Sequence, residues 1–279
     1  MDCRTNESFK EELKGVIINR WNDPAGIQNL YMGSSVFLLL SGPSLSKNDL
    51  TKLDKRGIIT FGVNNSPAVF KPNIWTFVDP SSKFHHGIWY DPSILKIVPL
   101  KRFKDYIREK KSDGFFYYVR NRVRHLPGVL GYRRNAEFNP PAWLYESTIN
   151  WGNDKKSAEK NGLPHILNVM FASLKLCFYL GFRTVYLLGC DFKMSLDSQN
   201  YAFPQDRTED SVRGNNSSYE KLNYMLGLLY PFFQKERFNV YNCNKDSGLN
   251  VFPYLSFDAA VKESTKLIPQ TLDTLGWYD

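Results

Sequence analysis

The chain has 279 residues, of which 42% are hydrophobic and 15% aromatic, and its formal net charge is +8. This length and apolar content exclude a mini-protein and a wholly disordered chain, and they fit one large domain. No apolar run approaches the roughly 20 residues that span a bilayer, and residues 1–7 lack the apolar core of a secretory signal. We therefore expect a cytoplasmic protein.

The cysteines and the net charge narrow the class of protein further. Cys3, Cys177, Cys190 and Cys243 are dispersed without a C-x-x-C pair, which argues against a zinc knuckle. Cys177 and Cys190 lie in apolar stretches, so we expect buried thiols in a reducing compartment. The positive charge favours an anionic partner, such as a phosphate-bearing small molecule, nucleic acid or an anionic glycan. A charge that serves only solubility is the alternative.

The first half of the chain has the pattern of an α/β sheet. Residues 1–34 form a polar lead-in with a helix-like apolar pattern from Phe9 to Ile18. Apolar runs then predict strands at 36–40, 58–63 and 74–78, with a helix near 46–55.

Polar residues follow each of these strands where it ends. In an open parallel sheet the carboxyl ends of the strands line a common crevice, which is where nucleotides bind. A glycine turn lets the ligand approach the backbone, and carboxamides can read a sugar hydroxyl or a base edge. Helix capping and turn formation are the structural alternatives for these residues. The predicted nucleotide-binding residues in this half are Ser41, Gly42, Pro43, Ser44, Asn64 and Asn65, and Asp79 follows the third strand.

Residues 81–150 are less regular and are interpreted as an insertion or lid over the site. Within them, region 101–134 mixes Lys and Arg with Phe and Tyr. Basic residues interleaved with aromatics suit a polyanion whose bases can be stacked upon, so nucleic acid is the expected partner there. An ordinary solvated helix face with core aromatics is the alternative.

The second half of the chain returns to α/β order. The apolar stretch from Leu163 to Leu180 predicts a long helix opened by Asn161 and Gly162, whose free N–H groups would face phosphate. A strand from Thr184 ends in Gly189-Cys190-Asp191, a polar loop covers 193–218, and a helix at 219–235 and a strand at 238–242 follow. We find no internal repeat or linker, so residues 1–279 are expected to form one domain.

Two carboxylates and one polar loop are the remaining candidates. Asp79 and Asp191 each follow a predicted central strand, and either can accept a proton from an attacking hydroxyl or bind a sugar. No D-x-D triplet occurs, so we expect no metal clamp on a nucleotide. Tyr201, Arg207 and Arg213 in the polar loop can hold a departing phosphate.

These motifs resemble a known family. Gly42-Pro-Ser-Leu45 after an apolar strand, Val63-Asn64, and Tyr186-Leu-Leu-Gly-Cys-Asp-Phe192 with Tyr201-Ala-Phe203 are similar to bacterial sialyltransferases of glycosyltransferase family 42. The resemblance covers roughly residues 35–255 and implies a single Rossmann-like (GT-A-like) domain that uses a nucleotide sugar without a metal. It extends to phage and metagenomic glycosyltransferase-like proteins, some linked to glycosylation of 5-hydroxymethylcytosine in DNA.

One departure from the family pattern concerns the general base and argues against sialyl transfer. The sialyltransferases use a His in the loop after the Tyr-Ala-Phe segment as general base, whereas the matching region here, Arg213–Tyr219, has none. Asp191 or Asp79 is then the candidate base.

The sequence therefore predicts a metal-independent transferase that uses a UDP- or CMP-linked sugar. The favoured acceptor is a hydroxymethylated pyrimidine in DNA, with the base flipped out of the duplex. Alternatives are a glycan or lipooligosaccharide sialyltransferase, a pterin-type pyrophosphokinase, and a non-catalytic nucleic-acid-binding module.

Overall fold

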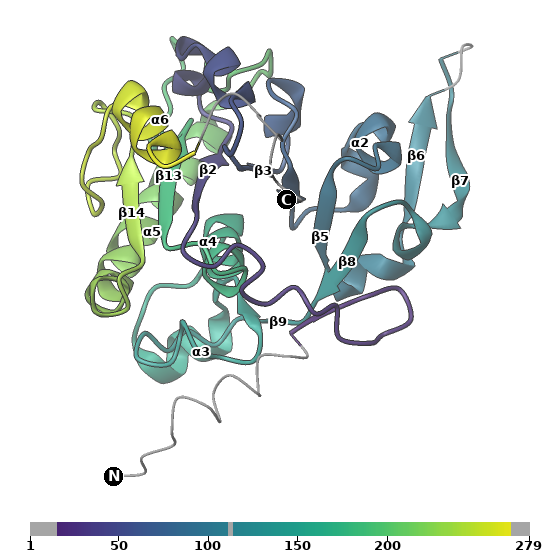
Figure 1. Cartoon of the computed structure of the whole chain (residues 1–279), viewed down its shortest axis with the longest axis horizontal. Helices are drawn as coiled ribbons and strands as arrows, with labels where there is room; N and C mark the ends of the chain where they lie inside the picture. The colour runs from purple at the N-terminus through teal and green to yellow at the C-terminus, as the bar shows by residue number, and fades with distance from the viewer. Residues whose placement is uncertain (1–15, 111–113, 269–279) are drawn as a thin grey trace, which may run out of the picture.

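The structure is a computed structural model that describes residues 16–110 and 114–268 (Figure 1). Its centre is an eight-stranded sheet in which every adjacent pair is parallel except the pair at one edge, β1 with β8. This confirms the mainly parallel α/β sheet predicted from the sequence. The strands run in the order β1 (Ile17–Ile18), β8 (Val129–Tyr132), β5 (Leu95–Pro99), β4 (Ile74–Thr76), β3 (Thr60–Val63), β2 (Ser35–Leu39), β13 (Thr184–Leu188) and β14 (Asn239–Asn242).

The continuous apolar runs of β2 and β13 reflect their place between two cores. Successive side chains of a strand point to opposite faces of the sheet. Leu38 and Leu187 accordingly belong to the core on one face, whereas Phe37 and Tyr186 belong to the core on the other, with ring centroids 4.9 Å apart. Because both faces are covered, neither strand has a polar alternate position.

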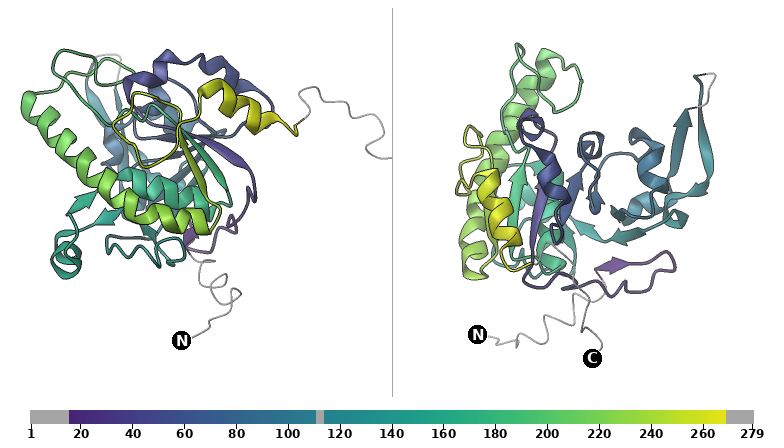
Figure 2. Two further views of the ribbon diagram at one scale, coloured as in Figure 1. Left: turned by 90° about the vertical axis from the view of Figure 1, so that its left-hand side faces the viewer. Right: turned by 45° about the horizontal axis from the view of Figure 1, so that its top comes forward.

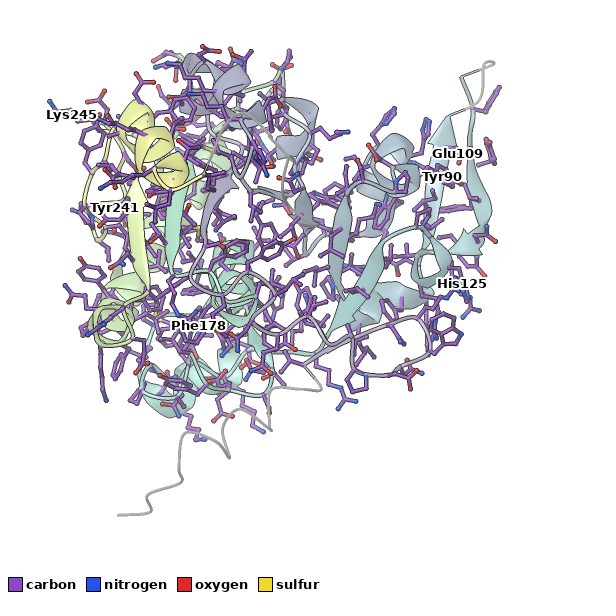
Figure 3. All side chains as sticks on the ribbon, in the orientation of Figure 1. Tyr90, Glu109, His125, Phe178, Tyr241 and Lys245 are labelled. Atoms are coloured by element: carbon purple, nitrogen blue, oxygen red, sulfur yellow. The ribbon has the colours of Figure 1, made fainter. Side chains whose placement is uncertain are left out.

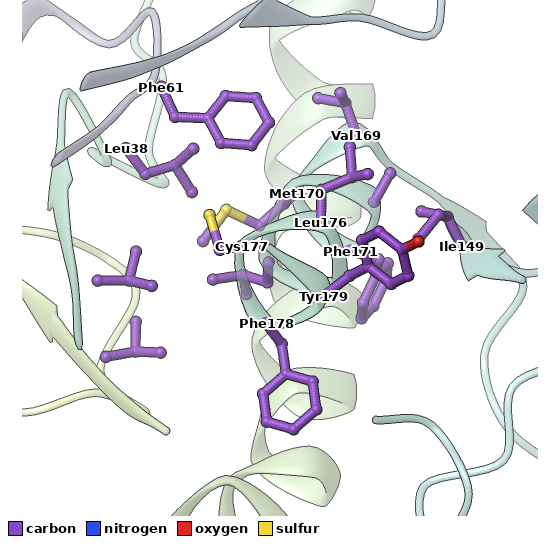
Figure 4. Close-up of a cluster of buried hydrophobic side chains, with 14 of the residues drawn as sticks. Leu38, Phe61, Ile149, Val169, Met170, Phe171, Leu176, Cys177, Phe178 and Tyr179 are labelled. Carbon is purple, nitrogen blue, oxygen red and sulfur yellow. The ribbon is translucent and has the colours of Figure 1, made fainter. Parts of the chain in front are cut away.

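Helices from distant parts of the sequence cover the two faces (Figure 2). On one face lie α4 (Val169–Tyr179) and α5 (Glu209–Lys235), and on the other lies α6 (Phe257–Thr265). Met170 and Cys177 of α4 lie toward Leu38 and Phe61 of the sheet (Figure 4). Cys177, like Cys190, is a buried free thiol, as predicted.

The long helix begins later than the sequence predicts. Asn161 is the last residue of a separate short helix, α3 (Lys155–Asn161), which Gly162 ends with a left-handed backbone (φ 66°). Helix α4 then starts at Val169, and the side chain of its N-cap Asn168 accepts a hydrogen bond from the N–H of Met170 at 2.8 Å. The prediction that Asn161 and Gly162 open this helix is therefore wrong, because a glycine of this geometry terminates a helix.

Helix α5 begins earlier than predicted and replaces part of the polar loop. Thr208 caps it by accepting from Ser211 N, and Glu209 and Asp210 in its first turn favour the helix dipole. Arg213 therefore lies in a helix instead of a loop. The single helix expected near 46–55 is also wrong: two 3₁₀ helices, η2 (Pro43–Lys47) and η3 (Leu50–Asp54), occupy that stretch.

Residues 81–150 differ from the irregular insertion that the sequence predicts. They supply β5 and β8 to the central sheet, and outside it a hairpin of β6 (Tyr106–Lys110) and β7 (Phe116–Arg122). A third core, which includes Trp75, Phe77 and Trp89, lies between this part of the sheet and the hairpin. Shorter elements are η5 (Ser81–Lys83), η6 (Leu100–Lys104), α2 (His86–Tyr90), and the paired strands β9 (Arg134–Asn135) with β10 (Ile149–Asn150) and β11 (Gly152–Asn153) with β12 (Ile166–Leu167).

The N-terminal lead-in is only partly described. The helix-like pattern predicted from Phe9 to Ile18 falls mostly on residues outside the described part of the chain. Ile17 and Ile18 within it form β1, which pairs antiparallel with β8.

Candidate functional site

A cavity of about 530 Å³ opens where β2, β3 and β13 end. Its walls come from the segments that follow these strands and β4, from the start of α4 and from the first half of α5. The polar residues predicted at three separate strand ends are thus brought to one place, as the parallel sheet requires. The predicted residues that line the cavity are Ser41, Gly42, Asn64, Asn65, Asp79, Asp191, Tyr201 and Arg207.

Other predicted site residues lie outside this lining. Pro43 and Ser44 stand just behind it in η2. Asn161 is held in a separate amide network, where its Nδ2 donates to Phe138 O and to Asn153 Oδ1, and Gly162 ends α3. Arg213 is exposed and ion-paired with Glu209 and Asp210 on its own helix. The structure therefore does not bring Asn161, Gly162 or Arg213 to the cavity.

The glycine turn after β2 packs against the segment after β13. Gly42 N donates to Gly189 O at 2.9 Å, and a Cβ atom added to Gly42 would stand 2.0 Å from Asp191 Oδ2. Ser44 donates to the same carboxylate oxygen from its N–H at 3.2 Å and from its hydroxyl at 2.8 Å. Glycine at position 42 is required because the turn and the carboxylate touch.

Asp191 is held firmly in this wall. Its side chain is buried, and its second oxygen, Oδ1, accepts from Asn244 Nδ2 at 3.0 Å. The carboxylate thus ties together the ends of β2, β13 and β14 through charge-assisted hydrogen bonds, which are stronger than neutral ones.

Asp79 has a different setting on the opposite wall. It follows β4, its side chain is 48% exposed, and it forms an ion pair with Lys83 of η5 at 3.5 Å. An exposed carboxylate with one long ion pair keeps lone pairs available for a substrate proton. Of the two predicted carboxylates, Asp79 is the one whose geometry suits proton transfer.

Asn64 is fixed by its backbone, with its side chain in the cavity wall. It has a left-handed backbone (φ 50°), its N–H donates to Thr76 O at 3.0 Å, and its carbonyl accepts from Trp75 Nε1 at 2.8 Å. Its Oδ1 is buried and has no hydrogen-bond partner among the described residues. Buried polar atoms of this kind are rare because they cost free energy. The described part of the fold therefore leaves the Oδ1 atom of the Asn64 carboxamide without a partner at the edge of the cavity.

Cationic and aromatic groups cover the remaining side of the cavity. Arg207 donates from Nη2 to the Tyr201 hydroxyl at 2.6 Å, and its guanidinium lies 5.0 Å from the Tyr201 ring centroid. Tyr201 stacks on Phe203, with ring centroids 5.5 Å apart. Lys193, tied to Asp246 O at 2.5 Å, and Lys83 add positive charge to the lining.

Burial also shifts the pKa values of two groups at this end of the sheet. It raises the pKa of Tyr219, whose ring stacks on Phe192 with centroids 5.0 Å apart. Burial, together with the neighbouring Asp191 carboxylate, raises the pKa of the Cys190 thiol. Both groups are therefore neutral at pH 7, and Cys190 is no thiolate nucleophile.

Several residues that line the cavity are not among those that the sequence predicts. Asn168, Val169 and Met170 place the start of α4 at the cavity. An Asn directly before an apolar run is an N-cap signal, and it identifies Asn168 as the start of this helix without the structure. Lys83 and Lys193 carry no such local signal, because only the tertiary fold turns them toward the cavity.

The described residues also bear on metal binding and on membrane insertion. No group of three or more His, Cys, Asp and Glu side chains in residues 16–110 and 114–268 could hold a metal ion. None of the helices in the same ranges is long and apolar enough to cross a membrane.

No protein-family model matches this sequence, and no curated protein matches it. Several solved structures, including the following two, are similar to the chain at low sequence identity. The sialyltransferase CstII from Campylobacter jejuni, in complex with cytidine-5'-monophosphate, is 14% identical over 81% of this chain and 86% of that one, with a TM-score of 0.44. The MAf glycosyltransferase from Magnetospirillum magneticum AMB-1 is 14% identical with a TM-score of 0.46, over 89% of this chain but 37% of that one.

Proposed function

We propose that the protein is a glycosyltransferase that uses a nucleotide sugar as donor. The observation that carries this proposal is the convergence of the Ser41-Gly42 turn, Asn64, Asp79 and Arg207 on one cavity at the carboxyl end of the sheet. The lining also includes Asp191 and Tyr201. Together with Gly42 and Asn64, these residues belong to the motifs that resemble family 42 glycosyltransferases in sequence, so the motifs share a site as well as a pattern.

The chemistry of the lining suits such a donor. The start of α4 offers the positive end of a helix dipole, and Lys83, Lys193 and Arg207 add full charges, a combination that favours phosphate. Carboxamides that can both donate and accept suit the hydroxyls of a sugar and the edge of a base. The lining carboxamides are Asn64, Asn65, Asn168, Asn200, Gln205 and Asn215. A UDP- or CMP-linked sugar fits this composition.

The transfer step follows from the same groups. The acceptor hydroxyl gives its proton to the Asp79 carboxylate as its oxygen bonds to the anomeric carbon of the sugar. The bond from that carbon to the phosphate oxygen breaks, and its electron pair leaves with the phosphate. Arg207 and the Tyr201 hydroxyl stabilise the negative charge that develops there, in the place a metal ion takes in other enzymes. Asp191, bound by Ser44 and Asn244, holds the glycine turn in position.

The positions of the histidines favour a carboxylate as the general base. None of His85, His86, His125 and His165 lines the cavity. The segment 213–219, where the resembling sialyltransferases carry their basic His, is part of α5 and contributes Asn215 and Tyr219 to the lining.

For the acceptor we propose the hydroxyl of a hydroxymethylated pyrimidine in DNA. The support is the charge of the chain and the basic–aromatic region 101–134, which joins the cavity wall through η5. A base within a duplex has to leave the stack before its hydroxyl can reach Asp79.

The test offers the protein several UDP- and CMP-linked sugars with DNA that contains 5-hydroxymethylcytosine, followed by mass analysis of the nucleosides. The expected result is a nucleoside heavier by one sugar unit, formed without added metal and in the presence of a chelator. Release of the free nucleotide from the donor is measured in parallel. Donor cleavage without modified DNA would reject the acceptor alone, whereas no cleavage with any donor would reject the transferase.

A further inference from the structure

The two sides of the β6–β7 hairpin have different surroundings. On the inner side, Ile107 is fully buried in the core beneath the hairpin. Glu109 accepts a hydrogen bond from the Tyr117 hydroxyl at 2.6 Å and is also bonded to Tyr90 of α2. Figure 3 shows Tyr90 and Glu109 beside each other between α2 and β6. The residues on the inner side are therefore accounted for by their contacts with the core and with α2.

The outer side carries alternating cations and tyrosines. Tyr106 and Arg108 share a face of β6 because they are two residues apart. Across the hairpin, Tyr106 pairs with Arg122, and Arg108 pairs with Tyr118. Arg122 Nε donates to the Tyr106 hydroxyl at 3.3 Å, and its guanidinium lies 5.8 Å from the ring centroid. The ring of Tyr118 is 66% exposed. We call these four residues the outer hairpin face.

The sequence segment that contains the hairpin carries much of the charge of the chain. Residues 101–124 contain nine Lys and Arg residues but only three Asp and Glu residues, and so account for most of the net charge of +8. A long strand edge with cations is also a common protection against aggregation. That protection requires charge alone and gives no reason for exposed aromatic rings between the charges.

The hairpin is tied to the cavity through η5. Ser81 at the start of η5 donates to Asp105 Oδ2 from its hydroxyl at 2.9 Å, and Arg102 bonds both Asp105 and Val78 O. Lys83, at the other end of η5, lines the cavity and pairs with Asp79. The base of the hairpin and the wall of the cavity are therefore linked through η5.

We propose that the outer hairpin face binds an extended single strand of nucleic acid. Bases stack on Tyr106 and Tyr118, and the phosphates between them contact Arg108 and Arg122. A duplex hides the faces of its bases, whereas a single strand, or a strand opened around a flipped base, exposes them. The proposal deepens the DNA acceptor proposed above and rests on it for its role in the reaction, although the binding itself needs no donor.

The experiment measures binding of the full chain to a fluorescent oligothymidylate of about 12 nucleotides by anisotropy, at several salt concentrations and without donor. Tyr118→Ser is expected to weaken binding about 5-fold or more, because it removes one stacked base. Arg108→Gln with Arg122→Gln is expected to weaken binding and to reduce the slope of log affinity against log salt by about 1.4, as two phosphate contacts are lost.

Matched variants on the far side of the molecule provide the control. Tyr224→Ser on α5 removes an exposed tyrosine, and Lys221→Gln with Lys262→Gln removes two exposed cations from α5 and α6. The control variants are expected to keep the affinity of the parent protein. Their slopes of log affinity against log salt are expected to change less than that of the Arg108→Gln, Arg122→Gln variant. Equal losses in the hairpin and control variants would overturn the proposal, as would no saturable binding. Tighter binding of duplex DNA or of a sulfated polysaccharide than of the oligothymidylate would also overturn it.

The outcome is separable from that of the proposed function. Hairpin-dependent binding of the oligothymidylate without any sugar transfer leaves this inference standing and rejects the acceptor assignment. Transfer to hydroxymethylated DNA at the same rate and KM in Tyr118→Ser and in the parent protein rejects this inference and leaves the transferase standing.

Discussion

Each of two walls of the cavity contains an aspartate that follows a parallel strand, but the surroundings of the two aspartates differ. After β13, Asp191 is buried and accepts hydrogen bonds from Ser44 and Asn244. After β4, Asp79 is half exposed and has one ion pair with Lys83. The comparison teaches that a carboxylate at a strand end can serve the architecture of a site or its chemistry, depending on how many donors already surround it.

The largest expected effect is on the chemistry at Asp79. Asp79→Asn removes the proposed base, so kcat is expected to fall about 10²- to 10⁴-fold. The loss of an exposed ion pair costs at most about 1 kcal/mol, so the melting temperature is expected to change little. Donor cleavage and calorimetry measure the two effects. Near-parental turnover in Asp79→Asn would remove Asp79 from the mechanism.

Removal of the Asp191 carboxylate on the other wall is expected to affect folding first. Asp191→Ala leaves the Ser44 and Asn244 donors without their acceptor, which costs about 2–4 kcal/mol of unfolding free energy. Asp79→Ala is the matched control and is expected to cost about 1 kcal/mol or less. Urea unfolding of both variants measures the difference. If Asp191→Asn kept full stability and lost all turnover, the roles assigned to the two aspartates would have to be exchanged.

A smaller effect is expected where the turn meets Asp191. Gly42→Ala places a Cβ atom against the Asp191 carboxylate, which costs about 1–3 kcal/mol of stability and weakens donor binding as the turn shifts. Gly214→Ala is the control, because nothing lies within 4 Å of its Cβ position and it is inside α5. Alanine there is expected to stabilise by about 0.5–1 kcal/mol. Unfolding curves and donor titrations of both variants test this contrast, and equal behaviour would contradict it.

The smallest expected effect concerns the phosphate side. Tyr201→Phe keeps the ring stack with Phe203 but loses the hydroxyl that accepts from Arg207. The kcat/KM for the donor is expected to fall about 2- to 10-fold, the worth of one hydrogen bond. Tyr224→Phe, an exposed tyrosine of α5, is the control and is expected to leave kcat/KM unchanged. An unchanged kcat/KM in Tyr201→Phe would show that this hydroxyl does not contact the leaving phosphate.

Much of the site could be predicted from local sequence. The apolar runs of β2, β3 and β13 are buried strands, and the residues just after them, Gly42, Asn64 and Asp191, line the cavity. This works because a buried parallel strand needs an unbroken apolar run and the topology then places its carboxyl end at the crevice. Strand ends are therefore a local signal of a shared site.

Other features depended on contacts between distant residues. Ser44 and Asp191 are 147 positions apart, and no local pattern separates an aspartate that is held by such a partner from one that is not. Residues 95–99 pair with β4, and residues 129–132 pair with β5 and β1. Local sequence does not reveal these partners, so the sequence alone predicts an insertion in this region.

The sequence by itself determined the α/β class, the buried strands and the polar turns after them, because these depend on the residues within a few positions of each other. The tertiary structure alone decided which aspartate is held and which is accessible. It also decided that Lys83 and Lys193 lie at the cavity and that Arg213 pairs on its own helix away from it. The physical reason is that burial and hydrogen-bond partners are set by elements that meet only when the sheet has formed.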